Sequence, residues 1–370
     1  MLRSIFACAL CSATVAASDN AHWDFELEPR RLHKTDRYNW AGNVEFSSTK
    51  VHIPENAREL TKIVKASENV RVFGTAHSFN DSADTDGEHV SLEKFRDMKY
   101  NPKNGDVTFG AGIRYIELIE FLKEKGRALR NVPSLPHINV VGSVMTGTHG
   151  SGIRNQNMAA QVTGIEYVRG EGDRKKIRAK GKDLNEILLS FGTKAIIYEM
   201  TMETVPEYGI KKCIYKDVPW DFLRDGNLFE SLNLEKDYIS FFTDWKDEKM
   251  TSVWTADRHG NAETGYDDVK NLSYQELCAP TWHGGKLIER THPVPLRDST
   301  PCVSSGFGMW DHKIYHFKPD QPPSSDGDEI QSEFFVKAED LPAAMLDLYA
   351  HAETFRDQVQ ITEVRGVAAD

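Results

Sequence analysis

The sequence has 370 residues, 39% of them hydrophobic and 27% charged, which is the balance of a globular protein large enough for two domains. Its net charge of −11 argues against a nucleic-acid backbone or an anionic membrane surface as a binding partner. Beyond the first residues no apolar run is long enough to cross a bilayer, so we expect no transmembrane segment in the mature chain.

The N-terminal segment, residues 1–17, has the pattern of a secretory signal peptide. Arg3 supplies a positive end, Ile5 to Ala17 form a short apolar core, and Val15-Ala16-Ala17 fits the rule of small residues before a cleavage site. We therefore expect cleavage near Ala17, and a protein that is secreted or resides in the lumen of the secretory pathway.

Such a cleavage leaves Cys213, Cys278 and Cys302 as the cysteines of the mature chain. They allow one disulfide and leave one thiol over. Cys278 and Cys302 are the nearer pair in the sequence. No pair of these cysteines has the CxxC spacing of a metal site.

Helix and strand patterns alternate between Asn39 and Pro206. Apolar periodicity and turn residues predict strands at Val51–Pro54, Val70–Phe73, Val90–Leu92, Val107–Phe109, Val162–Val168 and Ala195–Val205, and helices at Ala57–Ser67, Ile113–Lys125 and Leu184–Leu189. This order is typical of a mixed α+β domain. The change of pattern after Pro206 predicts a domain boundary near residue 207.

The stretch from Val70 to Asn80 is the first candidate ligand site. The predicted strand Val70–Phe73 runs into Gly74-Thr75-Ala76 and then His77-Ser78. Small residues after a strand let backbone N–H groups curve around a phosphate without Cβ clashes. The pattern is neither GxGxxG nor a Walker A loop. It predicts an anion cradle with an imidazole at its rim; the alternative is a plain turn with a surface histidine.

A second candidate segment runs from Asn131 to Gly152. Its hydroxyl side chains could all point donors at a polar ligand, and its glycines allow close backbone approach; they are Ser134, Ser143, Thr146, Thr148 and Ser151, with Gly142, Gly147, Gly150 and Gly152. The histidines His77, His137 and His149 lack the carboxylate or the close spacing that a metal site needs, so we expect no metal.

The second half of the chain, residues 208–370, has a different pattern of predicted strands, helices and loops from the first half. It predicts aromatic strands at Tyr238–Trp245 and Met250–Thr255, loops over 257–328, a strand at Glu329–Val336, a helix at Asp340–Phe355 and a strand at Ile361–Arg365. In the last strand Glu363 and Arg365 share one face, because they are two residues apart. Together they could clamp a polyol by hydrogen bonds. The alternative is a surface ion pair.

Taken together, these segments resemble the FAD-linked oxidases of the vanillyl-alcohol oxidase/PCMH superfamily. The superfamily resemblance lies in Arg71–Asn80, Ser134–Ile138 and Gly142–Gly150. Within the superfamily the chain is similar to the alditol (xylitol) oxidases, relatives of the sugar-1,4-lactone oxidases. That similarity lies in Asn39–Asn43, Ser134–His137, Phe242–Trp245, His292–Pro295, Gln331–Glu333 and Thr362–Arg365.

The resemblance implies an α+β fold: a PCMH-type FAD-binding domain of two α/β subdomains over 39–207, then a substrate or cap domain over 208–370. FAD would bind covalently through His77 to its 8α-methyl carbon. The residues implied to line the cofactor are Val72, Phe73, Gly74, Thr75, Ala76, His77, Ser78, Ser134, Asn139, Gly142, Ser143, Thr146 and Ile197. Glu363, Arg365 and Ser134 would be the catalytic residues.

The activity implied is hydride transfer from the terminal carbinol of an alditol, such as xylitol or sorbitol, to flavin N5, with dioxygen as acceptor and hydrogen peroxide as product. The alternatives are a D-arabinono-1,4-lactone or L-gulonolactone type of sugar lactone oxidase, and a flavin-binding remnant without turnover. Members of the family continue past the Glu-x-Arg strand with further strands and a His-Trp-Gly-Lys-like segment. The resemblance therefore implies a fragment, with the cap domain incomplete at its C-terminal end.

Overall fold

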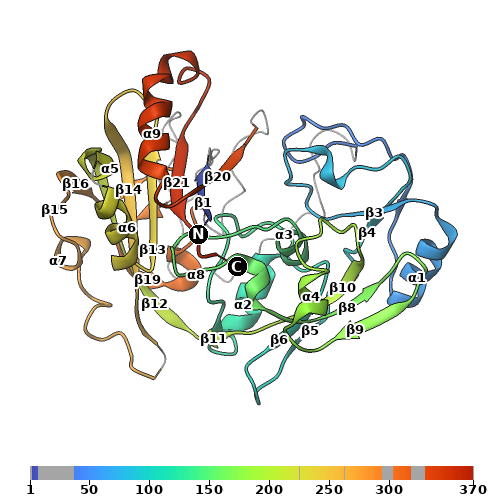
Figure 1. Ribbon diagram of the computed structural model, residues 1–370. Helices are drawn as coiled ribbons and strands as arrows, with labels where there is room; N and C mark the ends of the chain where they lie inside the picture. Colours follow the sequence, from blue (N-terminus) through green and yellow to red (C-terminus); the bar gives the residue numbers. More distant parts are fainter. Residues whose placement is uncertain are drawn as a thin grey trace.

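The computed structural model consists of two lobes that meet where the chain passes from β11 (Val205–Pro206) to β12 (Tyr208–Pro219) (Figure 1). It describes residues 37–224, 226–261, 263–293, 303–317 and 330–369, together with the backbone of 2–6; within 226–230 it describes the backbone only. The first lobe is drawn in blue to green and the second in yellow to red, except for the dark-blue strand β1 (Leu2–Phe6), which lies in the second lobe. The change from one sheet system to the next thus falls close to residue 207.

A small parallel sheet in the order β2-β4-β3 opens the first lobe. Its parts are β2 (Val51–His52), α1 (Ala57–Ala66), β3 (Val70–Phe73), a 3-10 turn (Asp81–Ala83) and β4 (Glu88–Ser91). Asn56 caps α1, because its side chain accepts hydrogen bonds from two backbone N–H groups of the first turn. Leu60 and Val64 bury the inner face of α1 in the core of the lobe. The β-α-β order is the one that the apolar periodicity predicts.

A five-stranded antiparallel sheet in the order β5-β6-β10-β8-β9 completes the first lobe. The strands are β5 (Met98–Tyr100), β6 (Val107–Gly110), β8 (Val162–Val168), β9 (Arg174–Ile177) and β10 (Ile196–Met202), and β7 (Arg127–Ala128) pairs with β11. The helices are α2 (Tyr115–Lys123), α3 (Val140–Met145), a 3-10 turn (Met158–Gln161) and α4 (Lys182–Asn185). The helix predicted over Leu184–Leu189 lies earlier: α4 begins at Lys182 and ends at Asn185, and residues 186–189 form turns, with Leu189 at a left-handed φ of 60°.

The second lobe is built on a nine-stranded sheet in the order β15-β16-β12-β14-β13-β21-β1-β20, with β19 also paired to β12. Its strands are β13 (Tyr238–Thr243), β14 (Lys249–Asn261), β15 (Thr281–Trp282), β16 (Gly285–Ile288), β19 (Gly306–Met309), β20 (Glu333–Lys337) and β21 (Thr362–Gly366), with β17 (Arg290–Thr291) and β18 (Val303–Ser304) forming a separate pair. Every pairing within the nine-stranded sheet is antiparallel.

Helices pack against this sheet and bury its apolar side chains (Figure 1). They are α5 (Asp221–Arg224), α6 (Gly226–Glu235), α7 (Tyr274–Leu277), α9 (Leu341–Ala350) and a 3-10 turn (Ala352–Thr354). The remaining helix, α8 (Trp310–Lys313), buries Trp310 in the core cluster that holds Leu60 and Val64 of the first lobe. Leu341 and Met345 of α9 join Phe241 of β13 and Val364 of β21 in one core cluster. Across the described residues, no helix has both the length and the apolar character needed to span a bilayer.

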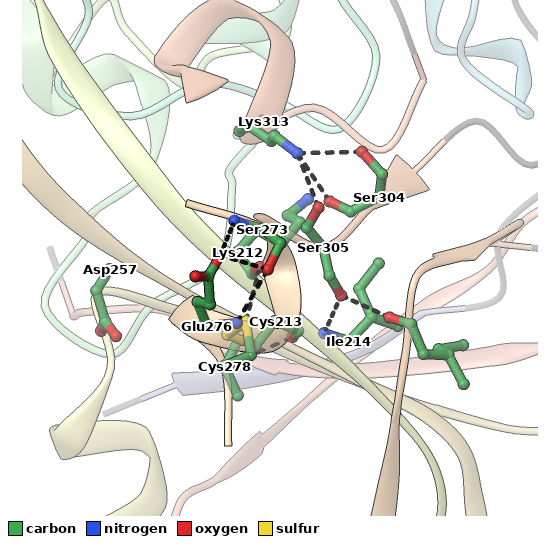
Figure 2. The surroundings of a disulfide bond; sticks show 12 residues. Lys212, Cys213, Ile214, Asp257, Ser273, Glu276, Cys278, Ser304, Ser305 and Lys313 are labelled. Atoms are coloured by element: carbon green, nitrogen blue, oxygen red, sulfur yellow. Dashed lines mark hydrogen bonds between the residues drawn. A yellow bond between two sulfur atoms is a disulfide. The ribbon is translucent and has the colours of Figure 1, made fainter. Parts of the chain in front are cut away.

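A disulfide joins Cys213 of β12 to Cys278 at the end of α7, across 65 residues of sequence (Figure 2). The pair that is nearer in the sequence, Cys278–Cys302, is therefore not the one that forms; Cys302 lies outside the described residues. Sequence separation was a poor guide because β12 passes directly beside the turn that follows α7. In Figure 2 the Ser305 hydroxyl, next to this disulfide, accepts from the Ile214 backbone N–H at 3.0 Å.

The backbone of β1 (Leu2–Phe6) lies between β20 and β21 in the large sheet. These residues belong to the segment predicted as a signal peptide, and the predicted cleavage site at Ala17 lies outside the described residues. Cleavage there would remove β1 from the sheet. β20 lies at the edge of the sheet, and β1 is the one described strand that pairs with it. Without β1, β20 would therefore have no hydrogen-bonded neighbour among the described strands.

Candidate active site

A cavity of about 1290 Å³ is lined by residues of both lobes. All of the residues that the family resemblance assigned to cofactor or substrate contribute to its wall: Val72, Phe73, Gly74, Thr75, Ala76, His77, Ser78, Ser134, Asn139, Gly142, Ser143, Thr146, Ile197, Glu363 and Arg365. Of the other hydroxyls of the second candidate segment, Thr148 lines the cavity and Ser151 does not. The cavity exceeds the roughly 300–1,000 Å³ of a pocket for a drug-sized ligand, so it has room for a dinucleotide. The tertiary structure thus brings together residues that are up to 293 positions apart (72 to 365).

The loop that follows β3 packs tightly against the start of α3. A Cβ atom on Gly74 would lie 2.5 Å from Oδ1 of Asn139, closer than real Cβ contacts allow. Asn139 is held in turn, because its Nδ2 donates to the Gly112 carbonyl at 3.1 Å. Ala76 has a left-handed φ of 55°, which turns the chain sharply before His77. The small residues of this loop are therefore required by its geometry.

His77 presents a neutral imidazole to the cavity. Burial, and after it the nearby His137, lower the pKa of His77 to about 3, so a ring nitrogen keeps its lone pair at neutral pH. The ring stacks on Trp40, with centroids 4.7 Å apart and planes inclined by 20°. A neutral imidazole at a cavity wall is the form that can act as a nucleophile.

The segment Asn39 to Asn43 holds the His77 loop from the other side. The Trp40 backbone N–H donates to the Ala76 carbonyl at 2.8 Å, and Nδ2 of Asn39 donates to the Ser78 carbonyl at 2.9 Å. Asn43 likewise donates to the Phe79 carbonyl at 2.9 Å. The sequence analysis used these residues only for the family resemblance and assigned them no role. Their contact with the loop follows from the fold and not from a local pattern.

Ser143 and Thr146, both predicted to line the cofactor, are among the residues of the cavity wall. The Ser143 hydroxyl donates to the Val140 carbonyl at 2.8 Å and lies 2.7 Å from the Tyr115 hydroxyl. Thr146, the residue that ends α3, lies with its hydroxyl 3.2 Å from the Gly142 carbonyl. Both hydroxyls therefore have partners within the protein.

Glu363 and Arg365 form a buried charged wall with Ser134. Their exposed fractions are 0% and 2%, so the alternative of a surface ion pair is wrong. Arg365 donates from Nη1 to the Ser134 hydroxyl at 2.9 Å, and the same nitrogen lies 3.8 Å from Oε1 of Glu363. Burial alone would raise the pKa of Glu363, but Arg365 and then His316 outweigh it, and the pKa lies below its usual value. Glu363 is therefore ionised at neutral pH.

His316 was missed by the sequence analysis, which treated its surroundings as loop. Its Nε2 lies 3.5 Å from Oε1 of Glu363, and its backbone N–H donates to the Ser134 carbonyl at 3.1 Å. Burial is the largest cause that lowers the pKa of His316 to about 4, so its ring is neutral at pH 7. His316 thus contacts two members of the charged wall, Glu363 and Ser134. No local sequence signal indicates this, since the contacts span 47 and 182 residues (316 to 363 and 134).

His149 is a buried histidine that also lines the cavity. Its Nε2 lies 2.6 Å from Oε1 of Glu333 in β20, and its Nδ1 lies 2.8 Å from the Gly150 carbonyl. This pair connects the segment after α3 with the second lobe. Among the described residues, no cluster of three or more His, Cys, Asp or Glu side chains could hold a metal ion.

Comparison with known proteins places these features in a family. Residues 49–178 match the family described as FAD binding domain. The chain is 33% identical over 343 residues to alditol oxidase of a Streptomyces species, and the aligned region covers 90% of this chain and 77% of that protein. The chain belongs to the FAD-linked oxidase family of alditol oxidase. It is also 28% identical over 286 residues to D-arabinono-1,4-lactone oxidase of Candida albicans, spanning 70% of this chain and 48% of that one.

A solved structure shares the fold at low sequence identity. Cholesterol oxidase from B. sterolicum superposes with a TM-score of 0.65 over 89% of this chain and 71% of that chain, at 11% identity. This likeness confirms the α+β fold expected from the resemblance, and the match of residues 49–178 to the FAD binding domain confirms that the first lobe is the FAD-binding one. The residues present also fit FAD, because the cradle at Gly74 has no room for a side chain and the cavity has room for a dinucleotide.

Proposed function

We propose that this chain oxidises a terminal CH–OH group of an alditol such as xylitol or sorbitol. Bound FAD would accept the hydride and pass the electrons to dioxygen, which gives hydrogen peroxide. The observation that carries the proposal is the buried wall of Ser134, Glu363 and Arg365 in the cavity that the FAD cradle also lines. The relationship to the Streptomyces alditol oxidase supports the same assignment.

The chemistry of this wall suits vicinal hydroxyl groups. A polyol hydroxyl both donates and accepts, while the ionised Glu363 only accepts and Arg365 only donates. Charge-assisted hydrogen bonds of both kinds would orient one end of the chain of hydroxyls. His316 would hold Glu363 and Ser134 in position relative to each other, because it contacts both. Burial lowers the local dielectric constant, which strengthens each electrostatic contact. These residues therefore bind and orient, while the transfer of electrons belongs to the flavin.

A sugar-1,4-lactone oxidase is the second candidate, favoured by the similarity to D-arabinono-1,4-lactone oxidase. The alditol oxidase and lactone oxidase candidates can be distinguished by their substrates. Hydrogen peroxide formation from xylitol, sorbitol and D-arabinono-1,4-lactone is measured with a coupled peroxidase. We expect the highest kcat/KM for an alditol, and loss of most of this activity in Glu363→Gln. A yellow protein that makes no peroxide from any of the three would instead be the remnant without turnover.

We also propose that His77 carries FAD covalently. Its neutral ring at the cavity wall and the family relationship support this. The wild-type protein should stay yellow after acid precipitation and give a fluorescent band on a denaturing gel. His77→Ala should release all of its flavin under the same treatment. Flavin that remains attached in His77→Ala would place the link on another residue.

Secretion remains a further proposal, supported by the N-terminal pattern and by the Cys213–Cys278 disulfide, which is typical of oxidising compartments. N-terminal sequencing of the native protein tests it. A mature chain that begins after Ala17 supports export and removes β1 from the sheet. A chain that still carries Leu2–Phe6 argues for the opposite, with β1 retained between β20 and β21.

A further inference from the structure

Trp40 is the side chain that contacts the imidazole of His77 face to face. The two rings stack at 4.7 Å with an angle of 20°, and both residues line the cavity. Trp40 is itself held in place by two contacts. Its backbone N–H donates to the Ala76 carbonyl at 2.8 Å, and its ring meets Phe79 edge-on at 6.3 Å. The indole is therefore a fixed surface against which the His77 ring lies.

The His77 ring has no hydrogen bond to any of the described residues, so the stack on Trp40 is what fixes its plane. This matters because the lone pair of an imidazole nitrogen lies in the ring plane. Rotation about the Cβ–Cγ bond would swing that lone pair away from an electrophile in the cavity. Torsions of this kind are broad and weakly restrained by themselves. Stacking on a large aromatic ring supplies the missing restraint.

We propose that Trp40 is a positioning residue for the covalent attachment of flavin to His77. The inference rests on the proposed function, because it presupposes that His77 carries FAD. In the attachment, a bond forms between a ring nitrogen of His77 and the flavin 8α carbon. One proton leaves the methyl group and one leaves the imidazole. The two electrons released reduce the flavin, and dioxygen reoxidises it to give hydrogen peroxide. Trp40 takes no part in these bonds and sets only the angle of attack.

The experiment compares Trp40→Leu, Trp40→Phe and a matched control, Phe95→Leu. Phe95 is an aromatic residue of the first lobe whose ring contacts Tyr198, and it is not among the residues that line the cavity. Each protein is produced in riboflavin-limited cells, mixed with FAD, and sampled over time. Acid-stable flavin gives the covalent fraction, and total flavin before precipitation gives the bound amount. Thermal unfolding reports whether the loop remains folded.

We expect covalent incorporation to be at least about tenfold slower in Trp40→Leu, which corresponds to 1.4 kcal/mol in the barrier. Total bound FAD and the melting temperature should stay near the wild-type values. Trp40→Phe should restore much of the rate, because an aromatic face remains, and Phe95→Leu should match the wild type. These results together support positioning by the stack.

Four outcomes would overturn the inference. A wild-type rate in Trp40→Leu means that the ring is oriented by something else. A parallel loss of total FAD and of the melting temperature means that Trp40 only supports the fold of the loop. An equal slowing in Phe95→Leu means that the loss follows from truncating an aromatic side chain of this lobe and not from the stack. Wild-type protein that binds FAD but holds none after acid treatment rejects the covalent proposal itself, and this inference with it.

Discussion

One wall of the cavity is backbone with small side chains, whereas another is buried charge. The loop wall, residues 72–78, comes from a single stretch after β3, and its shape depends on the absence of a Cβ at Gly74. The charged wall, Ser134 with Glu363 and Arg365, joins the first lobe to β21 through side chains alone. The comparison teaches that the two walls should fail in different ways: added atoms damage the loop wall, and lost partners damage the charged wall.

The largest effect is expected from Arg365→Met. Glu363 would remain buried without its guanidinium, and breaking a buried pair typically costs about 3–5 kcal/mol of unfolding free energy. The double variant Glu363→Gln/Arg365→Met should regain most of this stability, because no buried charge remains, while activity stays lost. Chemical denaturation measures both.

The control for that comparison is Arg37→Met. Arg37 pairs with Glu45 at 2.9 Å, but the two side chains are 54% and 48% exposed. An exposed pair of this kind contributes at most about 1 kcal/mol. A loss in Arg365→Met as small as that in Arg37→Met would contradict the view that buried charge builds this wall.

Acidification should lower the free energy of unfolding by less than Arg365→Met does, and it acts on residues at both walls. His316 has a pKa of about 4 in the folded protein, against 6.5 for the ordinary group. Below pH 6.5 His316 is protonated in the unfolded chain but stays neutral in the folded protein. The free energy of unfolding therefore falls as the pH drops from 6.5 to 4. The loss is about 1.4 kcal/mol per pH unit for each such group, or roughly 3 kcal/mol in all. His77 acts in the same direction, and Glu363, whose folded pKa is depressed, adds a loss at still lower pH.

Unfolding free energies between pH 4 and 8 test this in the wild type and in His316→Phe. The variant should lose less stability on acidification, by about the contribution of one histidine. The exposed His283→Gln should keep the wild-type curve. An unchanged slope in His316→Phe would show that this ring titrates normally in the folded protein.

The smallest effect is expected from Gly74→Ala. Its methyl group would press on Oδ1 of Asn139, which its bond to Gly112 holds in place. Overpacking of this kind costs about 1–3 kcal/mol, and it should lower the flavin-to-protein absorbance ratio as well. Gly170→Ala is the control, because a Cβ there meets nothing within 4 Å. Equal flavin content in the two variants would mean that the loop wall tolerates added atoms.

Local pattern is enough to predict much of this protein. The strand at Val70–Phe73, the helix that precedes it and the shared face of Glu363 and Arg365 all depend on a few neighbouring residues, and the structure has them where the periodicity places them. The small residues that end β3 are readable for the same reason, since a tight loop excludes side chains whatever the rest of the fold does.

Contacts between distant segments decided the remainder. That Glu363 and Arg365 are buried and not on the surface depends on Ser134 and His316, which the packing of the first lobe against the second brings beside them. The stack of Trp40 on His77 and the choice of Cys213 over Cys302 as the partner of Cys278 are of the same kind. Periodicity records which side of an element is apolar, but it does not record which other element will cover that side; only the packed chain does.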